Sequence, residues 1–467
     1  MRFCNPSRRV FNTTNISLLN RLLSLSLALV MAFTATVQPA AAQGGIALLR
    51  DTEIERLLKS YEEPLLKVAG IDPNAVHIYL VNDASLNAFV AEGQNIFIHT
   101  GLFLQTKTPN ELIGVLAHET GHMAGGHLST KSSAMRTAAI PVLVSMALGI
   151  VAMAMGGGNA GMAILMGGQQ FAQAQYLQFS RSQEATADQM GMTYLERTHQ
   201  SGRGMAAVFQ RLADEEAMSA FYGHDFISDH PASRERISSL EDRIEASPYK
   251  DVKDSPEAMH EYRMVQAKLA GYLSGVQDVL NRYPASDTSE EARYARAMAY
   301  FRKPDIAMAL KEVNSLIAQE PNNPYFQEML GQIYVDLSQP EKGIAPYQKA
   351  VDALPDAPLL RVALASAQVA FERGNLAQAA LSNLKVAVLQ EDDNPFAWYL
   401  MSQAYARLGN IPMADLSTAE QHYSIGNMGG AMQFAMRAQR GLTKGSAEWQ
   451  RANDILSIAT AQARDRR

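Results

Sequence analysis

The pattern of apolar and polar positions divides the chain into a part with both strands and helices and a second part with helices alone. Residues 46–68 interleave apolar and charged positions with a helical period. Three short runs rich in β-branched and aromatic residues predict strands at 76–81, 86–90 and 95–99, the last two joined at Glu92–Gly93. An apolar stretch that begins at Pro109 predicts a buried helix, because proline is tolerated in the first helical turn.

Beyond Ser247–Pro248 the pattern changes to alanine-rich helices with a period of about 34 residues. The clearest copies place aromatic, glycine and alanine residues at tetratricopeptide spacing: Leu330, Gly331, Tyr334, Gly343, Tyr347, Ala350 and Pro355, then Trp398, Met401, Tyr405 and Ala414. Stacked helix pairs of this kind bury a shared core and leave a concave surface for a protein partner. The chain is therefore predicted to be mainly α. An α+β domain with a small sheet occupies residues 43–247, and an α-solenoid of TPR-like helix pairs occupies residues 248–467.

The first 42 residues have the pattern of a secretory signal peptide. Four arginines precede an apolar run from Leu22 to Phe33, and Ala40–Ala42 forms a small-residue cleavage site. A permanent anchor is the alternative, but the apolar run is short for a membrane span. Cleavage is predicted near Ala42, with export to a bacterial periplasm.

Composition narrows the chemistry of the mature chain. Cys4 is the only cysteine and lies in the predicted signal peptide, so disulfides and thiolate metal ligands are excluded. The net charge falls from −6 to −10 when the four signal arginines are removed. An acidic chain without a basic run gives no support for nucleic-acid binding.

The stretch Ala117–His122, AHETGH, carries the strongest chemical signal. His118 and His122 are four residues apart, so on a helix both reach one metal ion. Glu119 stands beside the first histidine as a general base, which is the H-E-x-x-H arrangement of zinc peptidases. The alternative is a buried helix with two surface histidines. A metzincin would place a third histidine at position 128, which is leucine in this chain. His127 lies one residue earlier, about 100° away around the helix axis, so the chain does not have the metzincin pattern.

A second helix offers the missing ligand. Glu184 and Asp188 are four residues apart in FSRSQEATADQMG, and they share one helical face. One carboxylate can bind zinc while the other orients a ligand histidine. A solvated acidic face is the alternative.

These two stretches and the run His230–Ile237, HPASRERI, resemble the three signatures of the HtpX-like and CAAX-protease-like zinc metallopeptidases. The repeats narrow the resemblance to the BepA-type, beta-barrel assembly-enhancing proteases of the periplasm. The resemblance implies a zincin-type domain with one Zn2+ held by His118, His122 and Glu184. It also implies that Glu119 is the general base, that Asp188 contacts a metal ligand and not the metal itself, and that His230 lies in a loop over the metal.

Two further segments have alternative interpretations. In the zincin layout the strand near Asn95–Ile98 is predicted as the edge strand that pairs with extended substrate, although an ordinary hairpin is the alternative. Residues 137–180 contain no charge, and glycines interrupt their apolar pattern at 156–158. A single membrane span would separate Glu184 from His118. The remaining interpretations of 137–168 are a buried helix pair or a glycine-hinged lid that covers the cleft or touches a membrane.

Two functions remain open from the sequence. The first is a zinc endopeptidase that degrades misfolded envelope proteins and docks to an envelope partner through its repeats. The second is a repeat-based chaperone or assembly factor whose protease activity is secondary. The resemblance implies outer-membrane barrel precursors as clients and the barrel assembly machinery as partner. His230 could stabilise an oxyanion, or it could fill the open zinc position and keep the enzyme latent. It could also be a plain surface residue.

Overall fold

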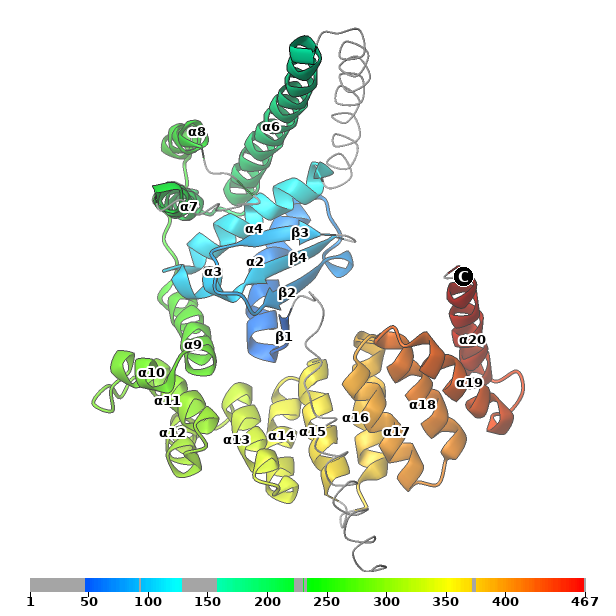
Figure 1. Ribbon diagram of the computed structural model, residues 1–467. Coiled ribbons are helices and arrows are strands. Elements are labelled where there is room, and N and C mark those ends of the chain that lie inside the picture. The colour runs from blue at the N-terminus through cyan, green and yellow to red at the C-terminus, as the bar shows by residue number, and fades with distance from the viewer. Residues whose placement is uncertain are drawn as a thin grey trace, which may run out of the picture. The chain divides into compact units, whose positions relative to one another are not determined.

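A computed structural model describes residues 47–91, 94–127, 158–221, 230, 233–371 and 375–465 (Figure 1). The predicted signal peptide and residues 137–157 of the predicted lid lie outside these ranges. The described residues form a small sheet with helices, followed by a long series of helix pairs, which confirms the predicted fold class. None of the described helices has the length and apolar character needed to cross a membrane.

The sheet has four strands in the order β1-β2-β4-β3. They comprise Leu48–Leu49 (β1), His77–Val81 (β2), Ala88–Ala91 (β3) and Asn95–His99 (β4). Strand β4 runs parallel to β2 on one side and antiparallel to β3 on the other. The prediction that residues 95–98 form the edge strand is therefore wrong, because both sides of β4 are already paired. The outer strands of the described sheet are β3 and the two-residue β1, and β1 was not predicted.

The helices of this first part are α2 (Thr52–Ala69), η1 (Pro73–Ala75), α3 (Thr100–Gln105), α4 (Pro109–Ala124), α6 (Gly158–Arg197), α7 (Arg203–Phe221) and α8 (Arg234–Ala246). Helices α2 and α4 pack together against the sheet. Leu58, Ile96 and Leu116 are fully buried in the core between them. Apolar burial of this kind is the main favourable contribution to folding.

Helix α6 approaches α4 very closely at two glycines. A Cβ atom on Gly121 would lie 2.6 Å from the carbonyl oxygen of Ala187, and one on Gly191 would lie 3.1 Å from Ala117. Side chains at these positions would push the two helices apart. The glycines thus allow histidines on α4 and carboxylates on α6 to meet.

Helix α9 (Pro256–Leu273) joins this core to the repeats. Its residues Tyr262, Val265 and Leu269 belong to the first core, while Met264 packs in a second core with Tyr294. The sequence prediction places α9 in the repeat region, and the boundary at residue 247 stays a prediction.

The following helices are α10 (Val276–Arg282), α11 (Glu290–Arg302), α12 (Ile306–Gln319), α13 (Pro324–Asp336), α14 (Pro340–Ala353), α15 (Pro358–Ala370), α16 (Ala377–Gln390), α17 (Pro395–Arg407), α18 (Ile411–Ser424), α19 (Met428–Gly441) and α20 (Ala447–Asp465). Consecutive helices pack as antiparallel pairs that follow one another along the chain (Figure 1). The Tyr347 ring lies directly against Gly331, where a Cβ atom would come within 2.8 Å. The predicted tetratricopeptide spacing thus corresponds to real contacts between the two helices of a pair.

Candidate metal centre

Helix α4 begins at a well-formed cap and carries both predicted histidines. The Thr108 hydroxyl accepts a hydrogen bond from the Glu111 amide, and Pro109 occupies the first turn. Ten or so residues later, His118 and His122 lie on the face toward α6 with 1% and 8% exposure. Their burial excludes the interpretation of two surface histidines.

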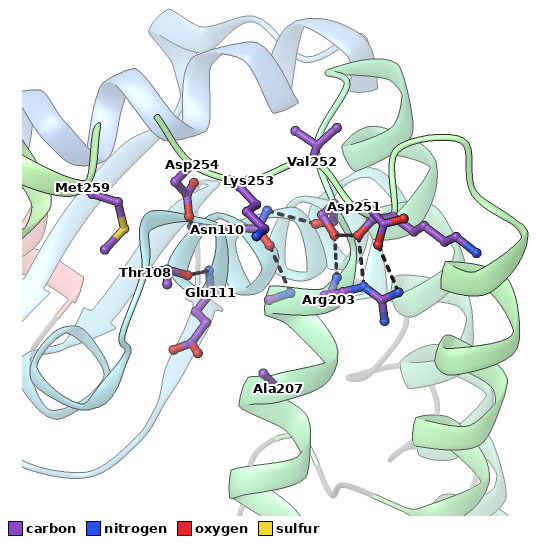
Figure 2. A pocket seen from close by; sticks show the side chains of 13 residues that line it. Thr108, Asn110, Glu111, Arg203, Ala207, Asp251, Val252, Lys253, Asp254 and Met259 are labelled. Atoms are coloured by element: carbon purple, nitrogen blue, oxygen red, sulfur yellow. Dashed lines mark hydrogen bonds and ion pairs between the residues drawn. The ribbon is translucent and has the colours of Figure 1, made fainter. Parts of the chain in front are cut away.

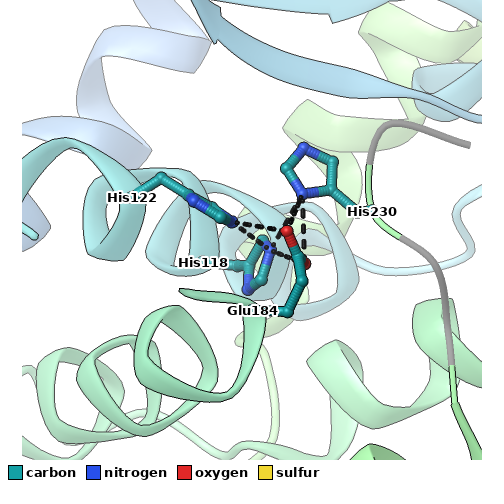
Figure 3. Close-up of side chains that lie close together, drawn as sticks. All are labelled: His118, His122, Glu184 and His230. Carbon is teal, nitrogen blue, oxygen red and sulfur yellow. Dashed lines mark hydrogen bonds and ion pairs between the residues drawn. The ribbon is translucent and has the colours of Figure 1, made fainter. Parts of the chain in front are cut away.

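His118, His122, Glu184 and His230 bring four ligand atoms within 4.8 Å of one another (Figure 3). The two histidine Nε2 atoms are 3.1 Å apart, and each lies 3.3–3.4 Å from an oxygen of Glu184. Zinc bonds of about 2.0–2.1 Å in a tetrahedron separate neighbouring ligand atoms by about 3.3–3.4 Å. Three imidazoles and one carboxylate at this spacing fit a divalent metal such as zinc.

His230 takes part in this cluster through Nδ1, although it is 46 residues from Glu184 in the chain. The atom lies 3.2 Å from both oxygens of Glu184 and 3.4 Å from Nε2 of His118. Its other nitrogen, Nε2, is 3.4 Å from Oε1 of Glu119. His230 therefore stands between the ligand atoms and the predicted general base, and it is not a remote surface residue.

Asp188 lies behind His118, one helical turn after Glu184. Its Oδ1 is 3.0 Å from Nδ1 of His118, so the carboxylate can accept the ring proton and orient Nε2 toward the metal position. Arg236 from α8 holds Asp188 with two hydrogen bonds of 2.7 and 2.8 Å and lies 3.0 Å from Glu184. The fork of an arginine matches a carboxylate in this way, and it fixes the position of both acids.

Proton affinities in the metal-free cluster follow from burial and from these partners. Burial opposes a charge on His118, but hydrogen bonds to Asp188 and Glu184 outweigh it and raise the pKa of His118 to about 9. Burial lowers the pKa of His122 to about 3. Although burial favours the neutral acid, the surrounding histidines hold the pKa of Glu184 well below its usual range. The metal-free cluster thus keeps a proton on His118, and a bound metal must displace it.

The space beside Glu119 is very small. A cavity of about 20 Å³ is lined by His118, Glu119 and His230 together with Ala88 of the outer strand β3. This volume holds about one water molecule. A larger cavity of about 520 Å³ lies at the starts of α4 and α7, between two and three turns before His118 (Figure 2).

The larger cavity has a structural explanation. The side chain of Asn110 donates to the carbonyl of Ser201 and accepts from the amide of Gly204, at 2.9 and 3.0 Å. Ser201 in turn donates to the carbonyl of Lys250. These bonds join α4, α7 and the segment before α9 at a polar surface, away from the metal ligands.

Sequence reasoning did not identify three residues around the site. Arg236 lies in the third signature stretch, but nothing in the sequence marked it as the partner of Asp188. Glu62 of α2 is 1% exposed, and its Oε1 is 2.8 Å from Oγ of Thr120 in the H-E-x-x-H motif. His127 was considered only as a ligand, whereas its Nδ1 lies 2.9 Å from Nδ1 of His122.

Known proteins resemble this chain over most of its length. The beta-barrel assembly-enhancing protease of Escherichia coli K12 is 25% identical over 413 residues, which cover 87% of this chain and 83% of that protein. The protein of the same name from Yersinia pestis is 27% identical, covering 78% and 74%. Metalloprotease LoiP of E. coli K12 is 33% identical over 36% of this chain and 62% of its own length.

Among solved structures, the crystal structure of MamA overlays on 36% of this chain and 95% of its own length, with a TM-score of 0.28 and 19% identity. The peptidase family M48 matches residues 49–244, the part that contains all four clustered ligands and Glu119. The chain is a metalloprotease in which the segment similar to peptidase family M48 is followed by TPR-like helix pairs.

Proposed function

We propose that this protein is a zinc-dependent endopeptidase of the bacterial periplasm, held latent by His230, that removes misfolded outer-membrane barrel proteins. The observation that carries the proposal is the four-ligand cluster with Glu119 beside it. In this proposal His118, His122 and Glu184 hold one zinc ion, Glu119 is the general base, and Asp188 orients His118. A bound zinc supplies a Lewis acid that makes water a stronger acid and polarises a peptide carbonyl.

Glu119 has the surroundings of a general base. Its carboxylate is 1% exposed, and the small cavity beside it is lined by His230 and by Ala88 of β3. A carboxylate in such a buried site can take a proton from a water and later deliver it to the leaving amine. These two proton transfers are the chemistry that peptide hydrolysis requires of the protein.

His230 supports latency through its two contacts. Nδ1 completes the tetrahedral spacing with Glu184 and His118, and Nε2 approaches Glu119. A catalytic zinc site keeps one position open, whereas a site with four protein ligands has none for water. The 20 Å³ cavity also leaves no room for a peptide. Activity therefore requires His230 to move away from the cluster.

Strand β3 is the proposed binding edge for an extended substrate. It is one of the two outer strands of the described sheet, and its first residue, Ala88, lines the cavity beside Glu119 together with the preceding Leu86 and Asn87. Main-chain pairing along such an edge gives affinity without a strict sequence requirement. Broad specificity suits the removal of misfolded proteins, and it makes a latent resting state necessary.

The clients and the compartment are proposed from the relatives and from the predicted signal peptide. Two relatives named beta-barrel assembly-enhancing protease align over 74–83% of their own lengths. The TPR-like helix pairs offer a surface for a protein partner, for which we propose the barrel assembly machinery. Residues 137–168 remain a proposed lid or peripheral membrane contact.

The test is cleavage of an unfolded outer-membrane barrel protein by the purified mature chain. We expect cleavage to stop when zinc is removed by a chelator and to return when zinc is added. Glu119→Gln should keep its zinc and lose activity. His230→Ala should raise activity at unchanged zinc content if His230 blocks the site, whereas a loss of activity would support the oxyanion role.

The alternative function, a chaperone or assembly factor with secondary protease activity, is distinguished by the same variant. If Glu119→Gln supports barrel assembly as well as the wild type does, proteolysis is dispensable for that role. The repeats favour this alternative as a second activity of the chain, because a protein-binding surface does not require Glu119.

A further inference from the structure

Another histidine lies next to the metal centre without being one of its ligands. His127 follows His122 by five residues, and its side chain is 9% exposed. Its ring stands on the far side of His122 from Glu184 and His230, at a centroid distance of 4.9 Å from the His122 ring. It does not belong to the group of four residues whose ligand atoms converge.

The atoms that face each other define which nitrogen of each ring carries a proton. His122 directs Nε2 toward Nε2 of His118 and Oε1 of Glu184, so Nε2 is its ligand atom. Its Nδ1 must then hold the ring proton. Nδ1 of His127 is 2.9 Å away and accepts that proton in a hydrogen bond, which leaves the proton of His127 on Nε2.

The backbone is shaped to bring the His127 ring to this position. Gly126 has a φ of +63°, a left-handed conformation that turns the chain sharply at the end of α4. The ring then folds back over Gly125, where a Cβ atom would come within 2.5 Å of Nε2 of His127. Gln183, the residue before Glu184, donates to the carbonyl oxygen of His127 at 3.4 Å.

We propose that His127 is a positioning residue that fixes the tautomer and ring orientation of His122, an inference that rests on the proposed zinc site. Metal-bound histidines generally donate their second ring proton to a carboxylate, a carbonyl or a water. His118 has a charged partner, Asp188, at 3.0 Å. His122 has a neutral imidazole instead, held by the Gly125–Gly126 turn. His127 thus acts on the metal through His122 and touches neither metal nor substrate.

The test measures the zinc dissociation constant of the mature full-length chain by competition with a chelator. His127→Leu removes the acceptor and should weaken zinc binding by about 10- to 100-fold. Gly125→Ala replaces no histidine, but its Cβ atom displaces the His127 ring, so zinc binding should also weaken. His127→Gln supplies a carbonyl acceptor and should recover most of the affinity.

His77→Leu is the matched control, because His77 is exposed at the start of β2 and is not a member of the four-residue cluster. Circular dichroism of each variant checks that the fold is retained. Wild-type affinity in His127→Leu or in Gly125→Ala overturns the inference, and so does a failure of His127→Gln to recover affinity. A wild-type chain that binds no zinc overturns the proposed function instead.

Discussion

Glu62 allows a prediction about pH that depends on a single buried carboxyl group. Oγ of Thr120 lies 2.8 Å from Oε1 of Glu62 and 2.7 Å from the carbonyl oxygen of Leu116. A hydroxyl has one proton to donate, and a carbonyl can only accept. Both contacts are hydrogen bonds if Glu62 is a neutral acid that donates to Thr120 while Thr120 donates to Leu116. Burial, together with repulsion from Glu119, raises the pKa of Glu62 to about 8.

The sign of the pH effect follows from these two states. The unfolded chain has an ordinary glutamate pKa near 4.5, so between about pH 4.5 and 8 the folded state binds a proton that the unfolded state lacks. The Glu62 contribution to stability therefore falls as pH rises, by about 1.4 kcal/mol per unit in the middle of this window. From pH 5.5 to 7.5 the loss is about 2.5 kcal/mol. Glu62→Gln resembles the neutral acid and lacks this loss.

The assay is hydrogen exchange of the peptides from α4, compared between Glu62→Gln and wild type at each pH. Intrinsic exchange rates cancel in this comparison, and protection reports the free energy of opening. We expect the protection ratio, variant over wild type, to rise about 70-fold between pH 5.5 and 7.5. Glu63→Gln is the matched control, because Glu63 is half-exposed beside Lys67, which keeps its pKa low. A ratio for Glu62→Gln that stays flat over this range would refute a neutral buried Glu62.

Three further predictions concern the metal and the connection to the repeats. Glu184→Ala should lower zinc affinity by more than roughly 100-fold, which is the largest loss expected for a residue that only orients a metal ligand. Full zinc content by elemental analysis would contradict the role of Glu184 as a ligand. Lys268→Met should cost about 3–5 kcal/mol in urea unfolding, because it leaves buried acids unpaired, while the exposed Lys67→Met should cost less than about 1 kcal/mol. A fragment of residues 43–274 should melt at a higher temperature than one of residues 43–247, which lacks α9; equal melting temperatures would support the boundary at 247.

The residues of the cluster could be selected from the sequence because their spacing shows which of them share a helical face. Residues four apart share one face of a helix, so His118 with His122, and Glu184 with Asp188, are readable before any fold is known. The structure brings Glu184 to the two histidines, and it adds His230 to the same cluster. The role of each of these residues is part of the proposed function.

The edge strand was mispredicted for a physical reason. Both hairpin strands have the same apolar alternation, and the choice between them depends on which one pairs with β2. That pairing is parallel and requires a crossover, which local sequence does not encode. The partners Glu62, His127 and Arg236 were missed for a related reason. Glu62 and Arg236 act across contacts between helices, and a lone charged residue on a helix looks the same whether it faces a partner or water. His127 depends instead on the turn at Gly125–Gly126, which folds its ring back onto His122.

The connection between the peptidase core and the repeats bears on whether the two proposed activities can be separated. Lys268 of α9 lies 2.6 Å from Asp51 and 3.2 Å from Glu53, at the start of α2. Tyr294 of α11 donates a hydrogen bond of 2.8 Å to the same Glu53. About 13 Å further along α2, Glu62 contacts Thr120 in the metal-binding helix.

Helix α2 therefore touches the first repeat helices at one end and the metal-binding motif near the other. Removing a buried lysine that lies between two carboxylates strongly destabilises the fold, because the carboxylates lose their partner. This junction therefore holds the helices together. A partner that displaced α11 would act on Glu53, and because α2 has no glycine between Glu53 and Glu62, the helix would move as a rigid body. A chaperone function confined to the repeats would not require this junction, whereas a protease controlled by its docking partner would.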